Sequence, residues 1–317
     1  MTDWIDVGVV GVGHLGKHHA RLYAQTPGAR LVGVVDLDRS RAQTVASEYG
    51  CRVFDTEEDL ASHTTAVSVA VPTEFHREVA VRLLSAGVHV LVEKPLARSI
   101  EEAERINTVA EEHDRLVMVG HTERFNPAVR ALYSAVHEPR FLEIHRLAAF
   151  SARSTDIDVV LDLMIHDLDL LLAFDGSAPI SVDAAGIAAL TDKIDIANAR
   201  IRLESGCVAN LTASRISPEP VRRIRVFQAR TYLSCDTGRR TVNRHQLVLQ
   251  EDGSPKILND MLPIEDAEPL AAELAAFVTA VRTGVRPSID GRQGQRALEL
   301  AHRVHQAIAD QRGLAGS

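Results

Sequence analysis

A glycine-rich turn near the N-terminus constrains the fold of this chain more than any other feature. The turn spans residues 11–16 (GVGHLG), follows the short apolar run of residues 7–10 and precedes residues 17–26, which have helical character. An apolar run too short for a helix predicts a buried parallel strand, because such strands are hydrophobic on both faces. Strand, glycine turn and helix in this order predict the start of a doubly wound parallel α/β sheet.

Each glycine of the turn has a separate purpose when a pyrophosphate lies against it. Gly11 permits a tight turn, Gly13 removes a side chain from the path of the phosphates, and Gly16 allows helix and strand to pack closely. The N-terminus of the helix also favours the negative charge of the phosphates. We therefore predict a dinucleotide site to which the turn contributes Gly11, Gly13, His14, Leu15 and Gly16.

The expected cofactor depends on Asp36. A second apolar strand, residues 31–35, ends at this residue, twenty residues beyond Gly16. A carboxylate there accepts hydrogen bonds from the free ribose of NAD and repels the 2′-phosphate of NADP. NAD is therefore the expected cofactor. NADP is the less favoured alternative, since Arg39 and Arg41 follow closely and an arginine can bind a phosphate.

Strand and helix patterns continue to alternate as far as residue 120. Apolar strand candidates occupy residues 52–54, 66–71, 88–92 and 116–119, with helical segments between them. The carboxyl ends of parallel strands meet at the edge where such sheets bind ligands. The residues that follow these strands are therefore candidate cofactor or substrate contacts: Val71, Pro72, Thr73, His76, Glu93, Lys94 and His121.

Length and composition indicate two hydrophobic cores. The 317 residues exceed the usual span of one core, and a hydrophobic content of 45% is sufficient for two. The formal net charge of -8 at pH 7 disfavours nucleic acid as a partner. Cys51, Cys207 and Cys235 are too dispersed for a disulfide framework or a zinc motif. No apolar run approaches the roughly 20 residues of a membrane span and no signal-peptide pattern is present, so a cytoplasmic location is expected.

From about residue 140 the pattern changes to longer alternating strands, which is typical of antiparallel sheets. The strand candidates are residues 140–150, 180–187, 196–203, 207–216, 221–229 and 241–250. We predict a Rossmann domain in residues 1–122 and, in residues 123–317, an α+β domain with a large, mostly antiparallel open sheet. Helices at residues 268–282 and 291–311 are expected to close this second domain. Because an open sheet face invites association, dimerisation is expected.

The predicted helix of residues 158–174 combines an apolar surface with acidic and imidazole side chains. At about 100° per residue, four of its polar side chains share one narrow stripe: Asp158, Asp162, His166 and Asp169. Most other positions are apolar, so the helix is expected to be buried. The stripe then faces either internal hydrogen-bond partners or a reaction site beside the nucleotide, and both alternatives are open at this point.

Three residues match the needs of hydride transfer from a carbinol to a nicotinamide. His166 titrates near neutral pH and can take the hydroxyl proton. Asp162, one turn earlier, can hold the imidazole and the substrate, and Lys94 can place a positive charge against the oxygen that becomes a carbonyl. Asp162 and His166 are too few ligands for a catalytic zinc, so no metal is expected.

These motifs resemble those of the Gfo/Idh/MocA family of sugar and cyclitol oxidoreductases, over essentially the whole chain. The resemblance rests on the glycine turn, on Glu93-Lys94-Pro95 and on the pair Asp162 and His166. It implies NAD(P) binding, a catalytic Lys94, and an acid/base His166 assisted by Asp162. It also implies a homodimer or homotetramer built through the C-terminal sheet.

Within the family, residues 121–129, 162–167 and 195–200 look like the UDP-N-acetylglucosamine 3-dehydrogenase branch. That resemblance implies oxidation of the sugar 3-hydroxyl to a ketone, which an aminotransferase then aminates for a 3-amino sugar of the lipid A type. The candidate substrate contacts are Lys94, His121, Arg124, Asn126, Arg153, Asp162, His166 and Arg215. An exposed interdomain salt bridge is an equal alternative for Arg124.

Two other functions remain open on the sequence. A cyclitol or free-sugar dehydrogenase would use the same His166 and Lys94. A non-catalytic NADH-binding regulatory protein would keep the fold, but it would have no need for a proton acceptor at His166.

Overall fold

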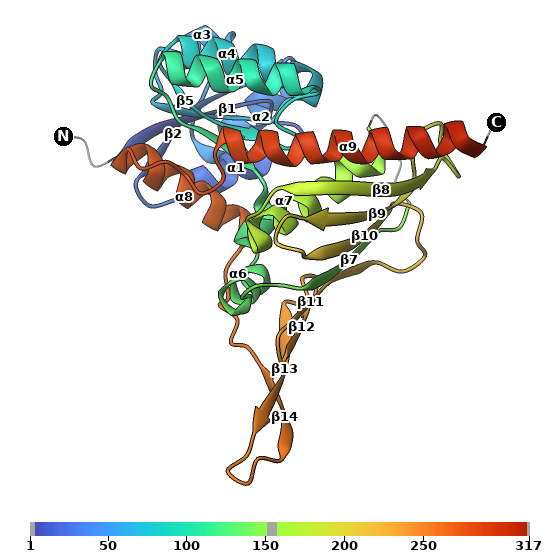
Figure 1. The fold of residues 1–317 in the computed structure, drawn as a ribbon. Helices are drawn as coiled ribbons and strands as arrows, with labels where there is room; N and C mark the ends of the chain where they lie inside the picture. Colours follow the sequence, from blue (N-terminus) through green and yellow to red (C-terminus); the bar gives the residue numbers. More distant parts are fainter. Residues whose placement is uncertain (1–3, 151–156, 316–317) are drawn as a thin grey trace. The chain divides into compact units, whose positions relative to one another are not determined.

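The computed structural model describes residues 4–150 and 157–315, and the chain divides into two compact units. The first unit comprises residues 1–122 and 268–298, and the second unit comprises residues 123–267 and 299–317. Each unit has its own sheet (Figure 1). Each unit also has its own buried side chains. Among the helices in the described ranges, none has the length and apolar character needed to cross a membrane.

The first unit contains a six-stranded parallel sheet with the order β3-β2-β1-β4-β5-β6. Its strands are β1 (Ile5–Val10), β2 (Ala29–Val35), β3 (Arg52–Val53), β4 (Ala66–Val69), β5 (His89–Glu93) and β6 (Val117–Gly120). β1, β4 and β5 are buried along most of their length, which explains their continuous apolar runs. The chain starts in the middle of the sheet and winds to both edges, so the predicted doubly wound topology is confirmed.

Helices alternate with these strands, and several begin at a capping side chain. They are α1 (Gly16–Tyr23), α2 (Arg39–Tyr49), α3 (Glu57–Ala61), α4 (His76–Ser85) and α5 (Ile100–Glu112). Asp38, Thr56 and Ser99 cap α2, α3 and α5, because each side chain accepts a hydrogen bond from a backbone N–H in the first turn. A short 3₁₀ turn, η1 (Thr73–Phe75), precedes α4.

Residues 268–298 belong to the first unit by their contacts, whereas the sequence pattern assigned them to the second domain. Helix α8 (Pro269–Thr283) packs on α1 and β1. Asn107 Nδ2 on α5 donates hydrogen bonds to Gly291 O at 3.2 Å and to Gln295 Oε1 at 2.8 Å. The chain thus returns to its first sheet after building the second, and local patterns do not reveal such a return.

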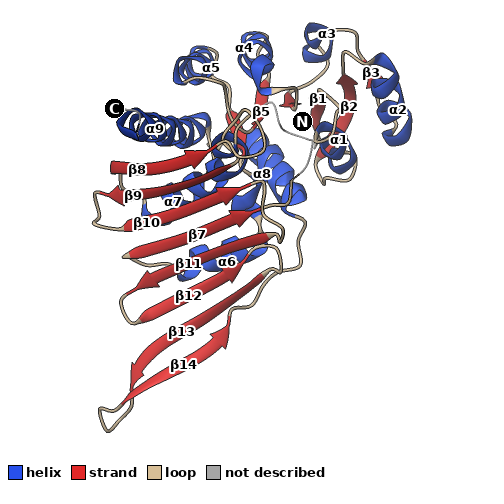
Figure 2. Ribbon diagram, turned by 90° about the vertical axis from the view of Figure 1, so that its right-hand side faces the viewer, coloured by secondary structure: helices blue, strands red, loops and turns tan. Residues whose placement is uncertain are grey.

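The second unit contains an eight-stranded sheet with the order β14-β13-β12-β11-β7-β10-β9-β8 (Figure 2). Its strands are β7 (Phe141–Leu147), β8 (Pro179–Ile187), β9 (Ile196–Leu203), β10 (Val208–Ser214), β11 (Val221–Gln228), β12 (Thr231–Asp236), β13 (Thr241–Leu249) and β14 (Pro255–Met261). All neighbouring strands are antiparallel except β7 and β10, so the predicted mostly antiparallel sheet is confirmed. β12 and β14 were absent from the sequence prediction.

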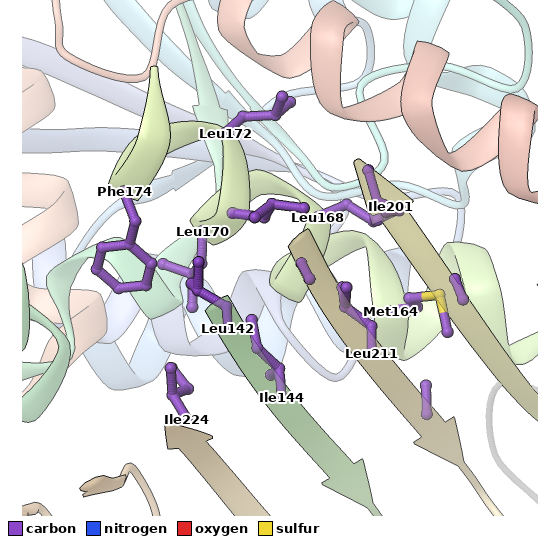
Figure 3. Packing of buried hydrophobic residues seen from close by; sticks show 14 of the residues in the cluster. Leu142, Ile144, Met164, Leu168, Leu170, Leu172, Phe174, Ile201, Leu211 and Ile224 are labelled. Atoms are coloured by element: carbon purple, nitrogen blue, oxygen red, sulfur yellow. The ribbon is translucent and has the colours of Figure 1, made fainter. Parts of the chain in front are cut away.

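One face of this sheet carries the core of the second unit. Helices α6 (Pro127–Ala135) and α7 (Ile165–Asp175) lie on this face, together with the later part of α9 (Gly291–Ala315) (Figure 2). Figure 3 shows Leu168 and Leu170 of α7 in a buried cluster with Leu142 and Ile144 of β7 and Leu211 of β10. Alternate residues of β7 and β9 are buried, as expected for strands with one packed face.

No helix in the described part of the second unit covers the opposite face, which we call the open face. Four rings form a row across it, from Phe141 through Phe227 and Tyr232 to His245, with centroid separations of 5.6, 4.8 and 5.3 Å. Beyond the row, all seven residues of β14 are exposed. In this row Phe227 is exposed and the other three rings are partly exposed. Apolar surface that remains accessible in this way can mark an interaction surface.

Candidate active site

The glycine turn between β1 and α1 is packed on its inner side and open above its middle. Gly11 has a φ of 82°, and a Cβ there would lie 2.8 Å from Ala70 O. A Cβ at Gly16 would lie 1.7 Å from Gly11 O, so α1 approaches the turn only because the side chain is absent. A Cβ at Gly13 would meet nothing closer than the Arg41 guanidinium, at 3.9 Å. This combination fits the approach of a pyrophosphate to the backbone at Gly13.

Asp36 lies at the end of β2 and is fixed by the backbone. Its Oδ2 accepts a hydrogen bond from Val12 N–H at 2.8 Å, and its Oδ1 accepts one from Asp38 N–H at 2.8 Å. The Arg41 guanidinium lies 3.3 Å from Oδ1. The carboxylate is therefore held beside the glycine turn, where the sequence predicts a ribose contact.

The other predicted cofactor contacts of the first unit lie at the surface or at strand ends. His14, Leu15 and Pro72 are exposed, and Val71, Thr73 and Lys94 are partly exposed. His121, which follows β6, is buried. A ligand can therefore reach the exposed and partly exposed residues in this structure, but it cannot reach His121.

His76 connects the end of β4 to the peptide after Lys94. Its ring is 1% exposed, with Nδ1 2.9 Å from Pro95 O and Nε2 2.9 Å from Val71 O. Burial lowers the pKa of His76, although the two carbonyl oxygens act in the opposite direction. The peptide between Lys94 and Pro95 is cis. The sequence placed His76 among the cofactor contacts, and the structure gives its ring two backbone partners inside the fold.

Glu93 fixes the main chain at Lys94 from the buried side. Its Oε1 lies 2.9 Å from His19 Nε2, and its Oε2 accepts a hydrogen bond from Lys94 N–H at 3.2 Å. Burial raises the pKa of Glu93, but the hydrogen bond and charge of His19, with the charge of Lys94, outweigh this, so that the net pKa is lowered. An ionised Glu93 therefore holds the backbone from which the Lys94 side chain emerges.

The helix that carries His166 begins with a π-helical turn, η3 (Val160–Met164), and continues as α7. Asp158 starts it: Oδ1 accepts hydrogen bonds from Val160 N–H at 2.8 Å and Leu161 N–H at 3.2 Å, and Oδ2 lies 2.9 Å from His305 Nε2. Burial raises the pKa of Asp158, but His305 and the two N–H groups outweigh this and lower it. π-helical turns occur often at functional sites.

Two arginines hold α7 to its surroundings. Arg146 on β7 donates to both carboxylate oxygens of Asp167, with the shortest distance 2.7 Å, and lies 3.0 Å from Glu123 Oε1. Arg124 binds Asp169 through Nε at 2.7 Å and Nη2 at 2.8 Å. Burial raises the pKa of Asp167 despite the opposing charge of Arg146. These pairs fix the rotation of α7 about its axis.

The single polar stripe predicted for this helix is wrong in part. Asp169 is 2% exposed and paired with Arg124, and Asp158 caps the helix start. The π-helical turn changes the angular spacing on which the stripe was based. Asp162 and His166 are partly exposed and remain the members of the stripe that a ligand can reach.

Three predicted substrate contacts have internal partners in the second unit. Arg124 is bound to Asp169, inside one unit rather than between domains. Asn126 caps α6 by accepting a hydrogen bond from Ala128 N–H and donates to Thr237 O. Arg215 is 5% exposed and donates to Ile157 O at 2.7 Å. Arg153 lies outside the described residues.

Several structurally important charged residues were not predicted. Arg146 is one whose signal was present, because it continues the alternation of the buried positions Leu142 and Ile144 on β7. Glu273 is another, as one carboxylate in the apolar segment LAAELAAFV of α8. In the described part of the chain, no group of three or more His, Cys, Asp and Glu side chains is arranged to hold a metal ion.

Comparison with known families assigns both units. Residues 5–121 match the model described as an oxidoreductase family with an NAD-binding Rossmann fold, and residues 128–237 match the Gfo/Idh/MocA C-terminal domain. The chain belongs to the Gfo/Idh/MocA oxidoreductase family. The family expected from the sequence motifs is thereby confirmed, and with it an enzyme that binds NAD(H)-type cofactors through a Rossmann fold.

Relatives within the Gfo/Idh/MocA family match nearly the whole chain. The UDP-N-acetylglucosamine 3-dehydrogenase of Acidithiobacillus ferrooxidans is 42% identical over 95% of this chain and 96% of its own length. A solved structure of that enzyme superposes with a TM-score of 0.90, at 40% identity, over 96% of this chain and 97% of that one. An inositol 2-dehydrogenase of Rhizobium meliloti is 26% identical over 96% of this chain and 97% of its own length.

Proposed function

We propose that this protein is an NAD-dependent dehydrogenase that oxidises the 3-hydroxyl of UDP-N-acetylglucosamine to a 3-keto nucleotide sugar. The observation that carries the proposal is the 42% identity to the Acidithiobacillus ferrooxidans enzyme over 95% of the chain. The accessible side chains Lys94, Asp162 and His166 support it, because they supply the groups that alcohol oxidation needs.

The first unit fits NAD through the open space above Gly13 and the fixed carboxylate of Asp36. When bound, NAD accepts the hydride that leaves the carbinol carbon. Asp36 favours NAD over NADP because its charge repels a 2′-phosphate. Arg41, the residue best placed to bind that phosphate, is instead paired with Asp36.

We assign proton transfer to the second unit. His166 accepts the proton of the sugar hydroxyl, since a neutral imidazole is available near pH 7. Asp162 precedes it on the same helix and orients the imidazole and the sugar. Lys94 of the first unit stabilises the negative charge that develops on the oxygen as the carbonyl forms.

The 3-keto sugar is proposed to pass to an aminotransferase, which would give a 3-amino sugar for lipid A-type synthesis. A cytoplasmic location accompanies this assignment, because the substrate and the cofactor are both soluble nucleotides. Association of two or four copies through the open face is proposed from the row of partly exposed aromatic side chains on that face.

The test follows NADH formation from NAD and UDP-N-acetylglucosamine, with a ketone trap to remove the product. We expect turnover by the native protein and a loss of about 10²–10⁴-fold in kcat for His166→Ala, with little change in KM for NAD. His137→Ala is the matched control, because His137 is an exposed histidine of the same unit. Full activity in His166→Ala would refute the proton-transfer assignment.

The second candidate, a cyclitol dehydrogenase, is favoured by the similarity to inositol 2-dehydrogenase. It shares the same proposed acid/base and cofactor residues, so the His166→Ala variant cannot distinguish the two candidate functions. A comparison of substrates distinguishes them. Turnover of myo-inositol or glucose, with none of UDP-N-acetylglucosamine, would establish the second candidate instead.

A further inference from the structure

A buried polar cluster in the first unit has no place in the reaction proposed above. It lies behind Lys94, on the side of the sheet covered by α1 and α8, and two of its members are carboxylates. Its members are His19, Tyr23, Ser68, Glu93, Thr122 and Glu273. His19, Tyr23, Ser68 and Glu273 are each 0% exposed and Glu93 is 6% exposed. Buried charges require partners, so the protonation of this cluster is constrained.

The two carboxylates, Glu93 and Glu273, differ in the number of hydrogen bonds that they accept. Glu93 is bound by His19 Nε2 at 2.9 Å and by Lys94 N–H at 3.2 Å. Glu273 receives one hydrogen bond, from the Thr122 hydroxyl to Oε2 at 2.8 Å. Its Oε1 is buried and has no hydrogen-bond partner among the described residues. An ionised carboxylate in this position would cost far more than a neutral acid.

Gly120 shows that the site is built around the Glu93 carboxylate. Gly120 is the partner of Glu93 in the pairing of β5 with β6. A Cβ on Gly120 would lie 2.9 Å from Glu93 Oε2. Any residue larger than glycine at position 120 would therefore meet the Glu93 carboxylate.

We propose that Glu273 carries a proton at neutral pH and acts as a positioning residue for Lys94. A neutral Glu273 allows Glu93 to remain ionised and to keep its hydrogen bonds with His19 and with Lys94 N–H. A second charge at Glu273 would oppose that of Glu93 and weaken both bonds. The protonation of Glu273 does not depend on the proposed reaction. The functional importance of positioning Lys94 rests on the proposed function, in which Lys94 stabilises the reacting oxygen.

Electrostatics supports this geometry. Burial, and next the charge of Glu93, raise the pKa of Glu273 well above its ordinary value. His19 on α1 and Lys94 after β5 act on the charge of Glu93, and Tyr23 on α1 is affected by the charge of Glu273. His121 after β6 is buried and precedes Thr122, which binds Glu273. Burial raises the pKa of Tyr23 well above its ordinary value, although the hydrogen bond with Ser68 Oγ at 2.7 Å acts in the opposite direction, so Tyr23 stays neutral.

The sign of the pH effect on stability follows from this shift. The folded protein binds the Glu273 proton more tightly than the unfolded chain does. The resulting stabilisation is complete below the unfolded pKa, about 4.3, and is lost as the pH rises through the folded pKa. Glu273→Gln replaces the neutral acid by an amide of similar shape and removes this dependence.

The first experiment compares the melting temperatures of the native protein and Glu273→Gln between about pH 5 and pH 9. We expect the native protein to lose stability relative to the variant by roughly 3–5 °C for each pH unit, up to the folded-state pKa. Glu268→Gln is the matched control, since Glu268 begins the same helix with its side chain 48% exposed, and its curve should parallel the native one.

Infrared spectroscopy provides a second measure of the same proton. The native protein should show the carbonyl band of a protonated carboxylic acid at neutral pH, and the band should be absent from Glu273→Gln. Parallel melting curves for the native protein and Glu273→Gln, with no acid band lost, would overturn the proposal.

Positioning is tested by hydrogen exchange at the Lys94 amide, which needs no substrate. At high pH we expect the native protein to lose protection at this amide while Glu273→Gln retains it, because only the native protein gains a second charge beside Glu93. Equal protection in both would reject positioning even if Glu273 holds a proton. Absence of sugar oxidation would count against the proposed function alone, since none of these measurements depends on turnover.

Discussion

Asp36 is held at the end of β2 by two backbone N–H groups, so its position does not depend on a bound ligand. A carboxylate fixed in this way can accept hydrogen bonds from a ligand without a further loss of side-chain conformational entropy. On the proposed function, its charge favours NAD over NADP, because a 2′-phosphate would be repelled by it.

Asp36→Ala is expected to weaken NADH binding by about 10–100-fold, the equivalent of losing hydrogen bonds to a charged group worth about 1.5–3 kcal/mol. Discrimination against NADPH should fall at the same time, because the repulsive charge is removed. Fluorescence titration with both reduced cofactors measures these changes. Asp55→Ala serves as control, because Asp55 is an exposed aspartate of the same unit that pairs with Arg39. Unchanged affinity in Asp36→Ala would exclude a ribose contact.

Residue types predict chemistry more readily than they predict partners. The glycine turn, Glu93-Lys94-Pro95 and His166 could be singled out because their chemistry is local to the sequence. Arg124 was taken as a substrate contact because it follows a predicted strand end, and Arg215 because an arginine can neutralise a diphosphate. The carboxylate and carbonyl groups that bind them come from distant segments, which no local pattern identifies.

At the scale of elements, α7 is a mainly apolar helix whose orientation is set by buried ion pairs. Arg146 contacts Asp167 and Glu123, and the three side chains are at most 12% exposed. Removing one partner from such a group leaves an uncompensated charge in the interior, which costs more than the pair contributed.

Arg146→Met is therefore expected to lower the free energy of unfolding by about 3–5 kcal/mol. Arg244→Met is the matched control, because Arg244 forms a surface pair with Asp260, and its effect should stay within about 1 kcal/mol. Urea denaturation followed by circular dichroism compares the two. Equal effects of both substitutions would show that the buried network does not hold the second unit together.

Elements with strong patterns could be predicted, and those that depend on distant contacts could not. The parallel strands and β9 follow from continuous or alternating apolar residues. β14 does not, since each of its residues is exposed and its sequence, PKILNDM, lacks an alternating apolar face. The π-helical turn at Val160–Met164 is likewise absent from the pattern, because it depends on where the helix must direct its side chains.

For the whole molecule, we expect copies of the chain to associate through the open face, as proposed above. Phe227 is 36% exposed at the centre of the row that runs from Phe141 to His245. A lysine there would place a charge in any interface formed by this face, and burial of an unpaired charge strongly opposes association.

Phe227→Lys is expected to convert a native dimer or tetramer into a species of monomer mass, measured by analytical ultracentrifugation. Val285→Lys should leave the native mass unchanged, because Val285 is an apolar residue of the first unit that is more exposed than Phe227, at 66%. A monomeric native protein, or an oligomer that survives Phe227→Lys, would contradict association through the open face.

β13 and β14 form the outer ribbon of the second sheet, and β14 has no buried residue (Figure 1). Two strands without an apolar cover are only marginally stable in water. In an isolated chain this ribbon would open more often than the inner strands, and proteases would cut it first. If other copies cover this ribbon, the resistance of each molecule to proteases rises with protein concentration. At low concentration the copies would separate, and each would be degraded sooner.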